Sequence, residues 1–266
     1  MSDKIFEPFD PILFGWNTLK SNLSFFTVLM IIVAGLYYIA PLIQMIFLSN
    51  IGSPPRADSL QWIAILSAFL YLIIYQVSEL GLITIALEFR DGAAHNIEDL
   101  FKNYRLFPNF LIGTIIYGLM VAIGFVLFII PGIYLSLKYL FYGYLIVDRG
   151  LGPIEALKEC GRMTDGAIKD ILVYLLTLWC GIAVIMMILG IFIIIPFGLI
   201  SATISKELAA GFAFIVSLIW MIVNLLMIVS ITKLSMADVY RTLEARSAMA
   251  SLSDGDQEGL ENMSAS

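Results

Sequence analysis

Six apolar stretches constrain the fold of this chain more than any other feature of its sequence. Several reach the roughly 20 residues that a helix needs to cross the hydrocarbon layer of a membrane. Apolar residues make up 60% of the chain and charged residues 14%, whereas soluble proteins carry about 25% charged residues. None of the stretches alternates as barrel strands do. We therefore predict an all-α integral membrane protein with six transmembrane helices, at 25–48, 60–87, 110–130, 132–147, 171–195 and 208–232.

The distribution of basic residues predicts the orientation. Six crossings place both termini on one side, which then holds twelve Lys and Arg residues, while only Arg56 and Lys206 lie on the other. Because cytoplasmic loops carry the excess of basic residues, both termini are predicted to be cytoplasmic. The net charge of −6 comes largely from the tail at 247–266, which holds four acidic and no basic residues. Its Ser, Gly and acidic composition predicts disorder, so we divide the chain into a membrane domain, 1–246, and this tail.

A repeated segment divides the membrane domain into three units. Residues 90–110 align without a gap with residues 147–167, so that Asp91 matches Asp148, and a weaker copy begins near Pro11. Each copy precedes a pair of crossings, and internal repeats of hairpins suggest pseudo-symmetry. We predict three hairpins related by a pseudo-threefold repeat, each preceded by a short amphipathic interfacial helix. The units are expected at about 10–90, 91–148 and 149–246.

The third copy gives the clearest interfacial helix. Ile154 and Leu157 lie on its predicted apolar face, and Glu155 and Arg162 on its polar face. Such helices lie in the headgroup plane with the apolar face toward the lipid. They could bind lipid headgroups, or act as elbows that hold the crossings in register. The mixed charge of the polar face favours elbows, because lipid-binding helices are polybasic.

The third and fourth crossings meet at Pro131 and Gly132, where we predict a turn with almost no loop. Pro131 lacks an amide donor, and Gly132 tolerates unusual backbone angles. The fourth crossing, 132–147, is then only about 24 Å long as a helix, against a hydrocarbon core of about 30 Å. Short crossings interrupted by Pro or Gly can mark transporter sites, but a plain turn is the preferred interpretation.

The stretch "IIPGIYLSLKYLFYGYLIVDRGLGPIEALKECGRMTDG", residues 129–166, resembles the signature of a bacterial six-helix inner-membrane superfamily. That superfamily includes the membrane-anchoring domain of some glycerophosphodiester phosphodiesterases and several uncharacterised membrane families. The matching features are the Pro131-Gly132 turn, Lys138, Asp148 and the elbow that follows. The resemblance implies a six-helix fold in the bacterial inner membrane. It implies no catalytic activity, because the phosphodiesterase is a separate soluble domain.

Glu79 and Lys138 are the two charged residues well inside the predicted crossings, about 15 Å from the cytoplasmic ends at 1.5 Å per residue. Gln76 and Asn224 are predicted at a similar depth. A lone charge at this depth costs about 2.5–3.5 kcal/mol on insertion scales, which a Glu79–Lys138 ion pair would offset. Lys138 could instead extend its side chain toward the interface. A pair could be a structural lock or a proton relay, and the scarcity of titratable neighbours favours the lock.

The sequence favours a function without catalysis. The single histidine, His95, lies in a predicted loop and has no second histidine to complete a metal site. We expect no catalytic residues, metal or cofactor, and the chain lacks the basic, aromatic patch of a nucleic-acid-binding protein. The leading prediction is a scaffold or accessory subunit that organises membrane lipids or another membrane protein, with the oligomeric state left open. The alternative is a transporter or channel for a small solute or lipid, with Glu79 and Lys138 as its site.

Overall fold

The computed structural model describes residues 5–50, 57–201, 216, 220 and 222–264, and within these ranges every regular element is helical. The prediction of an all-α fold is confirmed for this part of the chain. The α-helices are α1 Phe9–Ser21, α2 Leu23–Asn50, α3 Ala57–Asp91, α4 Phe107–Leu127, α5 Ile129–Lys138, α6 Tyr142–Arg149, α7 Pro153–Met163, α8 Ile168–Ser201 and α10 Ser230–Ser264. Two 3-10 turns, η1 Ile97–Phe101 and η2 Tyr104–Leu106, precede α4, and a π-helical segment, η3 Leu225–Val229, precedes α10.

Several helices are long and apolar enough to cross a membrane. Five spans meet this criterion, and the bent pair α1–α2 would make a sixth; the five are Ile65–Asp91, Ile97–Leu127, Ile129–Arg149, Ile168–Phe192 and Ile222–Ala250. They carry exposed apolar side chains, including Leu66 (68% exposed), Val126 (87%) and Phe192 (73%). Such continuous apolar exposure is compatible with a membrane protein. Most of the predicted crossing at 208–232 lies outside the described residues.

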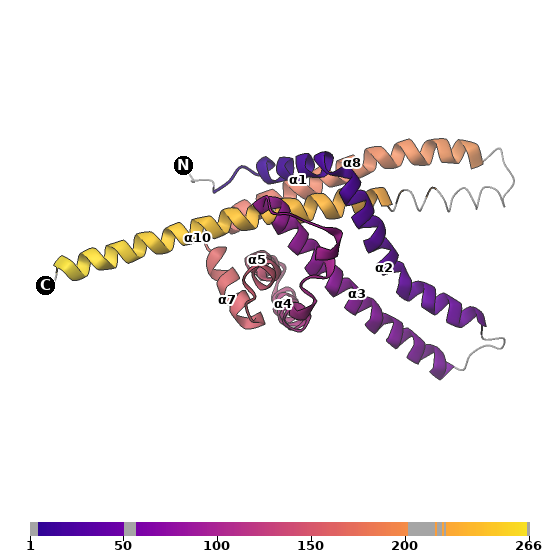
Figure 1. Cartoon of the computed structure of the whole chain (residues 1–266), viewed down its shortest axis with the longest axis horizontal. Helices are drawn as coiled ribbons and strands as arrows, with labels where there is room; N and C mark the ends of the chain where they lie inside the picture. The colour runs from indigo at the N-terminus through magenta and orange to yellow at the C-terminus, as the bar shows by residue number, and fades with distance from the viewer. Residues whose placement is uncertain (1–4, 51–56, 202–215, 217–219, 221, 265–266) are drawn as a thin grey trace.

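The first and last helices of the chain lie side by side. In Figure 1, α1 runs along α10, while the α2–α3 hairpin leaves this pair at an angle. The bend between α1 and α2 is 93°, so α1 is a separate helix and does not extend the first crossing. Close packing on α10 depends on Gly15, because a Cβ added there would lie 3.0 Å from the carbonyl oxygen of Ile231.

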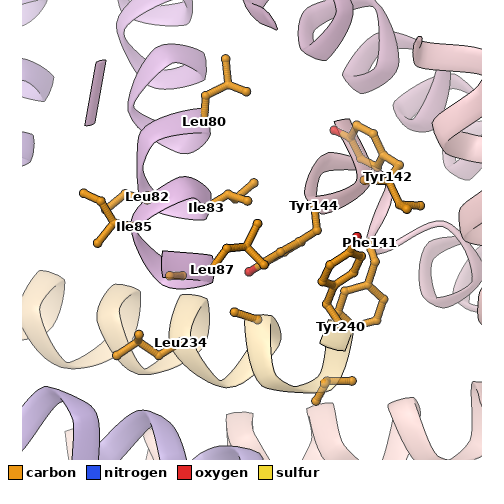
Figure 2. Packing of buried hydrophobic residues seen from close by; sticks show 14 of the residues in the cluster. Leu80, Leu82, Ile83, Ile85, Leu87, Phe141, Tyr142, Tyr144, Leu234 and Tyr240 are labelled. Atoms are coloured by element: carbon orange, nitrogen blue, oxygen red, sulfur yellow. The ribbon is translucent and has the colours of Figure 1, made fainter. Parts of the chain in front are cut away.

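The core lies where α3, α6 and α10 meet. Figure 2 shows Ile83 and Leu87 of α3 directed toward Tyr144 of α6 and Tyr240 of α10, and Phe141 lies beside them. All five side chains are buried, with Phe141 and Tyr240 fully enclosed. Farther along α3 from this core, the apolar side chains of Trp62, Leu66 and Phe69 are exposed.

The turn between α4 and α5 differs from the sequence-based expectation. The chain reverses at Phe128, whose backbone is extended (φ −165°, ψ 157°), and Pro131 lies in the first turn of α5, where a missing amide costs no helical hydrogen bond. Gly132 has no positive φ. Its role is close packing, since a Cβ on Gly124 would lie 2.9 Å from the Gly132 Cα atom.

The fourth predicted crossing, 132–147, is not one continuous helix. Helix α5 ends at Lys138, and α6 begins at Tyr142. The residues between them form turn-type hydrogen bonds, such as that from the Leu140 amide to the Leu137 carbonyl (3.4 Å). Because of this break, the Lys138 side chain has a different partner from the one predicted.

The second predicted interfacial helix is replaced by the 3-10 turns η1 and η2. These turns pack against α3 so closely that a Cβ on Gly81 would lie 2.0 Å from the carbonyl oxygen of Leu100. The Asn103 side chain also donates a hydrogen bond to Thr84 Oγ1 (2.9 Å). Tertiary contact with α3 therefore overrides the helical pattern of this segment.

The third predicted interfacial helix is present as α7, with one change of face. Leu157 is buried as expected, and Glu155 and Arg162 are exposed, but Ile154 is 59% exposed. Gly161 of α7 packs closely on Lys138 and Tyr139, where a Cβ would lie 3.3 and 3.1 Å from their side chains. Ile154 is two helical turns away from this contact.

Helix α10 continues to Ser264 and so includes residues 247–264 of the acidic segment. Ala, Met, Leu, Gln and Glu in this segment are good helix formers, and they outweigh its Ser and Gly residues.

Candidate functional site

An ion pair inside two candidate membrane spans forms the centre of the site. Lys233 of α10 donates a hydrogen bond to Glu79 of α3, and both side chains are largely buried, at 18% and 17% exposure. The pair therefore joins the end of the second predicted crossing to the last helix. Pairing and hydrogen bonding offset the large cost of burying each charge alone.

The predicted Glu79–Lys138 pair is wrong in this structure. Lys138 Nζ instead lies 2.8 Å from Asp165 Oδ1, and the Asp165 side chain is 61% exposed. The sequence-based estimate of depth assumed a continuous helix from Gly132 to Val147. Because α5 ends at Lys138, the lysine reaches the segment between α7 and α8 instead. Lys233 was assigned to the cytoplasmic side, where no partner for Glu79 was sought.

Gln76 and Asn224, the other two predicted members, have different surroundings. Gln76 is buried (4% exposed) one helical turn from Glu79. Asn224 donates to the carbonyl oxygen of Trp220 (2.7 Å) in its own helix, so that bond does not connect it to Glu79. Asn224 directly precedes the π-helical segment η3. Single π-helical turns inside longer helices are frequent at functional sites, and no sequence pattern predicts this one.

Three buried hydroxyl groups near the ion pair lack hydrogen-bond partners among the described residues. They are Ser78 Oγ, next to Glu79, and Ser230 Oγ and Thr232 Oγ1, on the turn that carries Lys233. Buried polar groups are normally satisfied. The region around the pair therefore has spare capacity to bind water or a polar group.

A second cluster lies at the ends of α3 and α6, where Arg241 of α10 binds three carboxylates. Its Nε and Nη2 atoms donate to Asp91 (2.9 and 2.5 Å), and its Nη2 and Nη1 atoms donate to Asp148 (2.8 and 2.9 Å). Nη1 also donates to Glu244 (2.7 Å). These five bonds use all five N–H donors of a guanidinium group.

The same two aspartates were aligned as equivalent positions of the repeat. Each stands at or beside the end of its helix, just ahead of a glycine with positive φ, Gly92 (67°) or Gly150 (64°), a conformation that suits glycine at a helix end. The repeat predicts the correspondence of Asp91 and Asp148 but not their common partner. Only the fold brings Arg241 to both.

Further ion pairs surround Arg241. Arg90 lies 2.5 Å from Asp238, and Arg149 lies 2.8 Å from Glu244. The Tyr240 hydroxyl donates to Asp148 (2.9 Å). The cluster thus ties the ends of α3 and α6 to one face of α10.

The remaining chemically active side chains are held in packed or loop environments. Within the described residues, no group of three or more His, Cys, Asp or Glu side chains could hold a metal ion. The His95 ring packs on Phe89 at a centroid distance of 3.7 Å. Burial raises the pKa of the Cys160 thiol to about 12, and its Sγ atom donates to the Lys138 carbonyl (3.4 Å), so this thiol stays protonated and unreactive at neutral pH.

Searches for related proteins add no assignment to this geometry. No family model matches the chain, and neither curated proteins nor solved structures give a significant match.

Proposed function

We propose that this chain is a non-catalytic multi-pass protein of the bacterial inner membrane, a scaffold or accessory subunit that organises lipids or a partner membrane protein. The observation that carries this proposal is that the charged side chains of the two clusters are bound in ion pairs within the protein. The pairs of Glu79 with Lys233, and of Arg241 with Asp91 and Asp148, join separate helices, and Arg241 retains no N–H donor for a substrate. Charges bound in this way act as structural locks. Membership of the six-helix superfamily stays a prediction that points to the same membrane.

The proposed orientation places both termini in the cytoplasm. A cysteine introduced at Ser53 should react with a membrane-impermeant maleimide in spheroplasts, because the predicted loop between the first two crossings faces the periplasm. A cysteine at Ser264 should react only after the membrane is opened. Labelling of Ser264→Cys in intact spheroplasts would contradict the orientation.

A flux measurement separates the scaffold from a transporter. Proteoliposomes that enclose a pH-sensitive dye are given a proton gradient, with protein-free liposomes as the baseline. A scaffold should leave the rate of pH equilibration at the baseline. A faster rate that Glu79→Gln removes would contradict the scaffold and identify a proton pathway.

One observation favours transport as a second candidate. The partnerless hydroxyls of Ser78, Ser230 and Thr232 and the adjacent π-helical segment resemble the polar, irregular backbone at which membrane transporters bind solutes. In this alternative the site is Glu79 with Lys233, and Lys138 takes no part. The proteoliposome experiment tests it directly.

A further inference from the structure

Two grooves of different chemistry adjoin the N-terminal segment. The first has a volume of about 670 Å³, and its lining includes Ile5, Arg90, Arg241, Arg246 and Met249. It lies beside α10, close to the cluster around Arg241. Three guanidinium groups at one groove suggest recognition of an anion, because the planar guanidinium matches phosphate and carboxylate oxygens.

Two of these arginines have donors to spare. Arg241 uses all five in the carboxylate cluster, but Arg90 approaches Asp238 through Nε, and no bond from its two Nη groups is found among the described residues. Arg246 makes one long bond, from Nη1 to the Asp165 carbonyl (3.4 Å), and has no carboxylate within 4 Å in the described part of the chain.

Two acidic side chains in this region, Asp165 and Asp170, have partners of their own. Asp165 binds Lys138 at 2.8 Å, and Asp170 accepts a hydrogen bond from the Ile5 amide (3.2 Å). Within the described part of the chain, Arg246 is therefore a positive charge without a paired carboxylate, at a groove of suitable size.

The second groove lies between α1 and α8 and is almost entirely apolar. It consists of two adjoining hollows of about 660 and 200 Å³, which share Phe9, Thr177, Gly181 and Ile185. Trp16 lines the inner hollow. A Cβ on Gly181 would meet no atom within 4 Å, so this glycine leaves the groove open. Figure 1 shows α1 next to both α8 and α10, and Ile5 of the first groove lies in the segment just before α1.

The spacing of the grooves fits one kind of molecule. The basic groove reaches Ile5 and the apolar groove begins at Phe9, four residues farther along the chain. From Phe9 to Trp16 the apolar groove follows α1 for about 12 Å at 1.5 Å per residue. An acyl chain occupies about 15 Å, half of the 30 Å hydrocarbon core. In a membrane, a phosphate joined to an apolar chain of this length is a phospholipid.

We propose that the chain binds one anionic phospholipid, whose phosphate contacts Arg90 and Arg246 and whose acyl chain lies between α1 and α8. This inference rests on the proposed lipid-organising function and names the lipid class and the site. The lipid would link α1, α8 and α10, which the ion pairs described above do not join to one another.

Native mass spectrometry of the delipidated full-length chain in detergent tests the proposal. Dioleoyl phosphatidylglycerol should bind in a 1:1 ratio and more tightly than dioleoyl phosphatidylcholine. Arg246→Gln should weaken binding about tenfold or more, because it removes charged hydrogen bonds to the phosphate. Gly181→Leu should also weaken binding by filling the apolar groove. The matched controls are Arg162→Gln, an exposed arginine outside the groove, and Gly118→Leu, where a Cβ also meets nothing within 4 Å.

Several results would overturn the proposal. Equal binding of the two lipids, or equal effects of Arg246→Gln and Arg162→Gln, would exclude the basic groove as a headgroup site. Full competition by inorganic phosphate would indicate a site for a free anion. Unchanged binding by Gly181→Leu would exclude the acyl groove, and a changed oligomeric state in that variant would assign the groove to a second copy of the chain.

Thermal unfolding verifies that each variant is folded, and Arg90→Gln replaces Arg246→Gln if the latter is not. None of these outcomes alters the flux test of the scaffold, so the two proposals fail separately.

Discussion

Replacing Arg241 with methionine should destabilise the protein more than any other single change at its surface charges. Arg241 is the common partner of Asp91, Asp148 and Glu244, which come from three helices. Methionine preserves much of the apolar length of the side chain but removes all five donors. Three carboxylates then lie close together with no positive charge between them, apart from the contact of Arg149 with Glu244.

The expected magnitude follows from the exposure of each partner. Asp148 is 17% exposed and Arg241 is 21% exposed, and breaking a buried pair by removing one partner typically costs about 3–5 kcal/mol. Asp91 is 41% exposed, so its bond should contribute no more than a surface pair, about 0–1 kcal/mol. Allowing for partial solvent screening of the whole cluster, we expect a loss of about 2–4 kcal/mol in the free energy of unfolding. Arg241→Lys should recover only a small part, because an ammonium group cannot bind three carboxylates in this geometry.

Equilibrium unfolding in mild detergent, followed by circular dichroism, measures the loss. Arg162→Met is the matched control, because Arg162 is 72% exposed and pairs only with Glu159 on its own helix; we expect a change of about 0.5 kcal/mol or less. A double-mutant cycle of Arg241→Met with Asp148→Leu should show non-additivity. The reasoning is refuted if Arg241→Met and Arg162→Met have equal effects, or if the cycle is additive.

Three further predictions concern single contacts. Glu79→Leu or Lys233→Met alone should cost about 3–5 kcal/mol and the double variant much less, because replacing both members of a buried pair is often nearly neutral; thermal unfolding in detergent measures this. Cys160 should resist N-ethylmaleimide at pH 8 in the folded protein, because a pKa of about 12 leaves almost no thiolate, and mass spectrometry of the intact protein detects the adduct. The same raised pKa predicts that this thiol's contribution to stability is lost as the pH rises from about 9 toward 12. Gly124→Ala should destabilise by about 1–3 kcal/mol through overpacking, seen as a lower midpoint of thermal unfolding.

Each of these predictions has a control in the same chain. Glu79→Leu and Lys138→Met together should give additive losses in the free energy of unfolding, because the two residues have separate partners. If the double variant instead regained stability, that result would support the Glu79–Lys138 pair predicted from the sequence. A cysteine at the exposed Lys158 should react with the maleimide within minutes; equal reactivity of Cys160 would show that the thiol is accessible. Gly118→Ala lies on the same helix as Gly124 in open space, so an equal loss would exclude close packing as the cause.

The helices themselves were predictable because their apolar runs are long and need no tertiary partner to be recognised. The described helices cover most of the predicted crossings, and α1 and α7 occur where their amphipathic patterns begin. The second predicted interfacial helix is absent for a physical reason: η1 and η2 are packed against Gly81 of α3, a contact between residues 19 apart that local periodicity cannot reveal. The apolar face of α7 was predicted from residue spacing alone. Spacing cannot show that Ile154 is exposed, because its exposure depends on which helices pack against α7.

The candidate site was predicted less well than the fold. Glu79 was identified correctly as a residue that needs a counter-charge, because its cost in an apolar span follows from sequence. The partner of Glu79 was not predicted correctly. The membrane depth of Lys138 was counted along an uninterrupted helix, whereas α5 ends at Lys138. The convergence of Asp91 and Asp148 on Arg241 depends on residues about 93 and 150 positions apart. The repeat marked both aspartates, but no local pattern marked the arginine.

The packing of α1 along α10 has a consequence for the order in which the protein is completed during synthesis. During synthesis α1 is made before α10, so the backbone surface at Ile231 against which Gly15 packs is absent until α10 is made. A chain that stops before α10 therefore leaves this face of α1 without its packing partner.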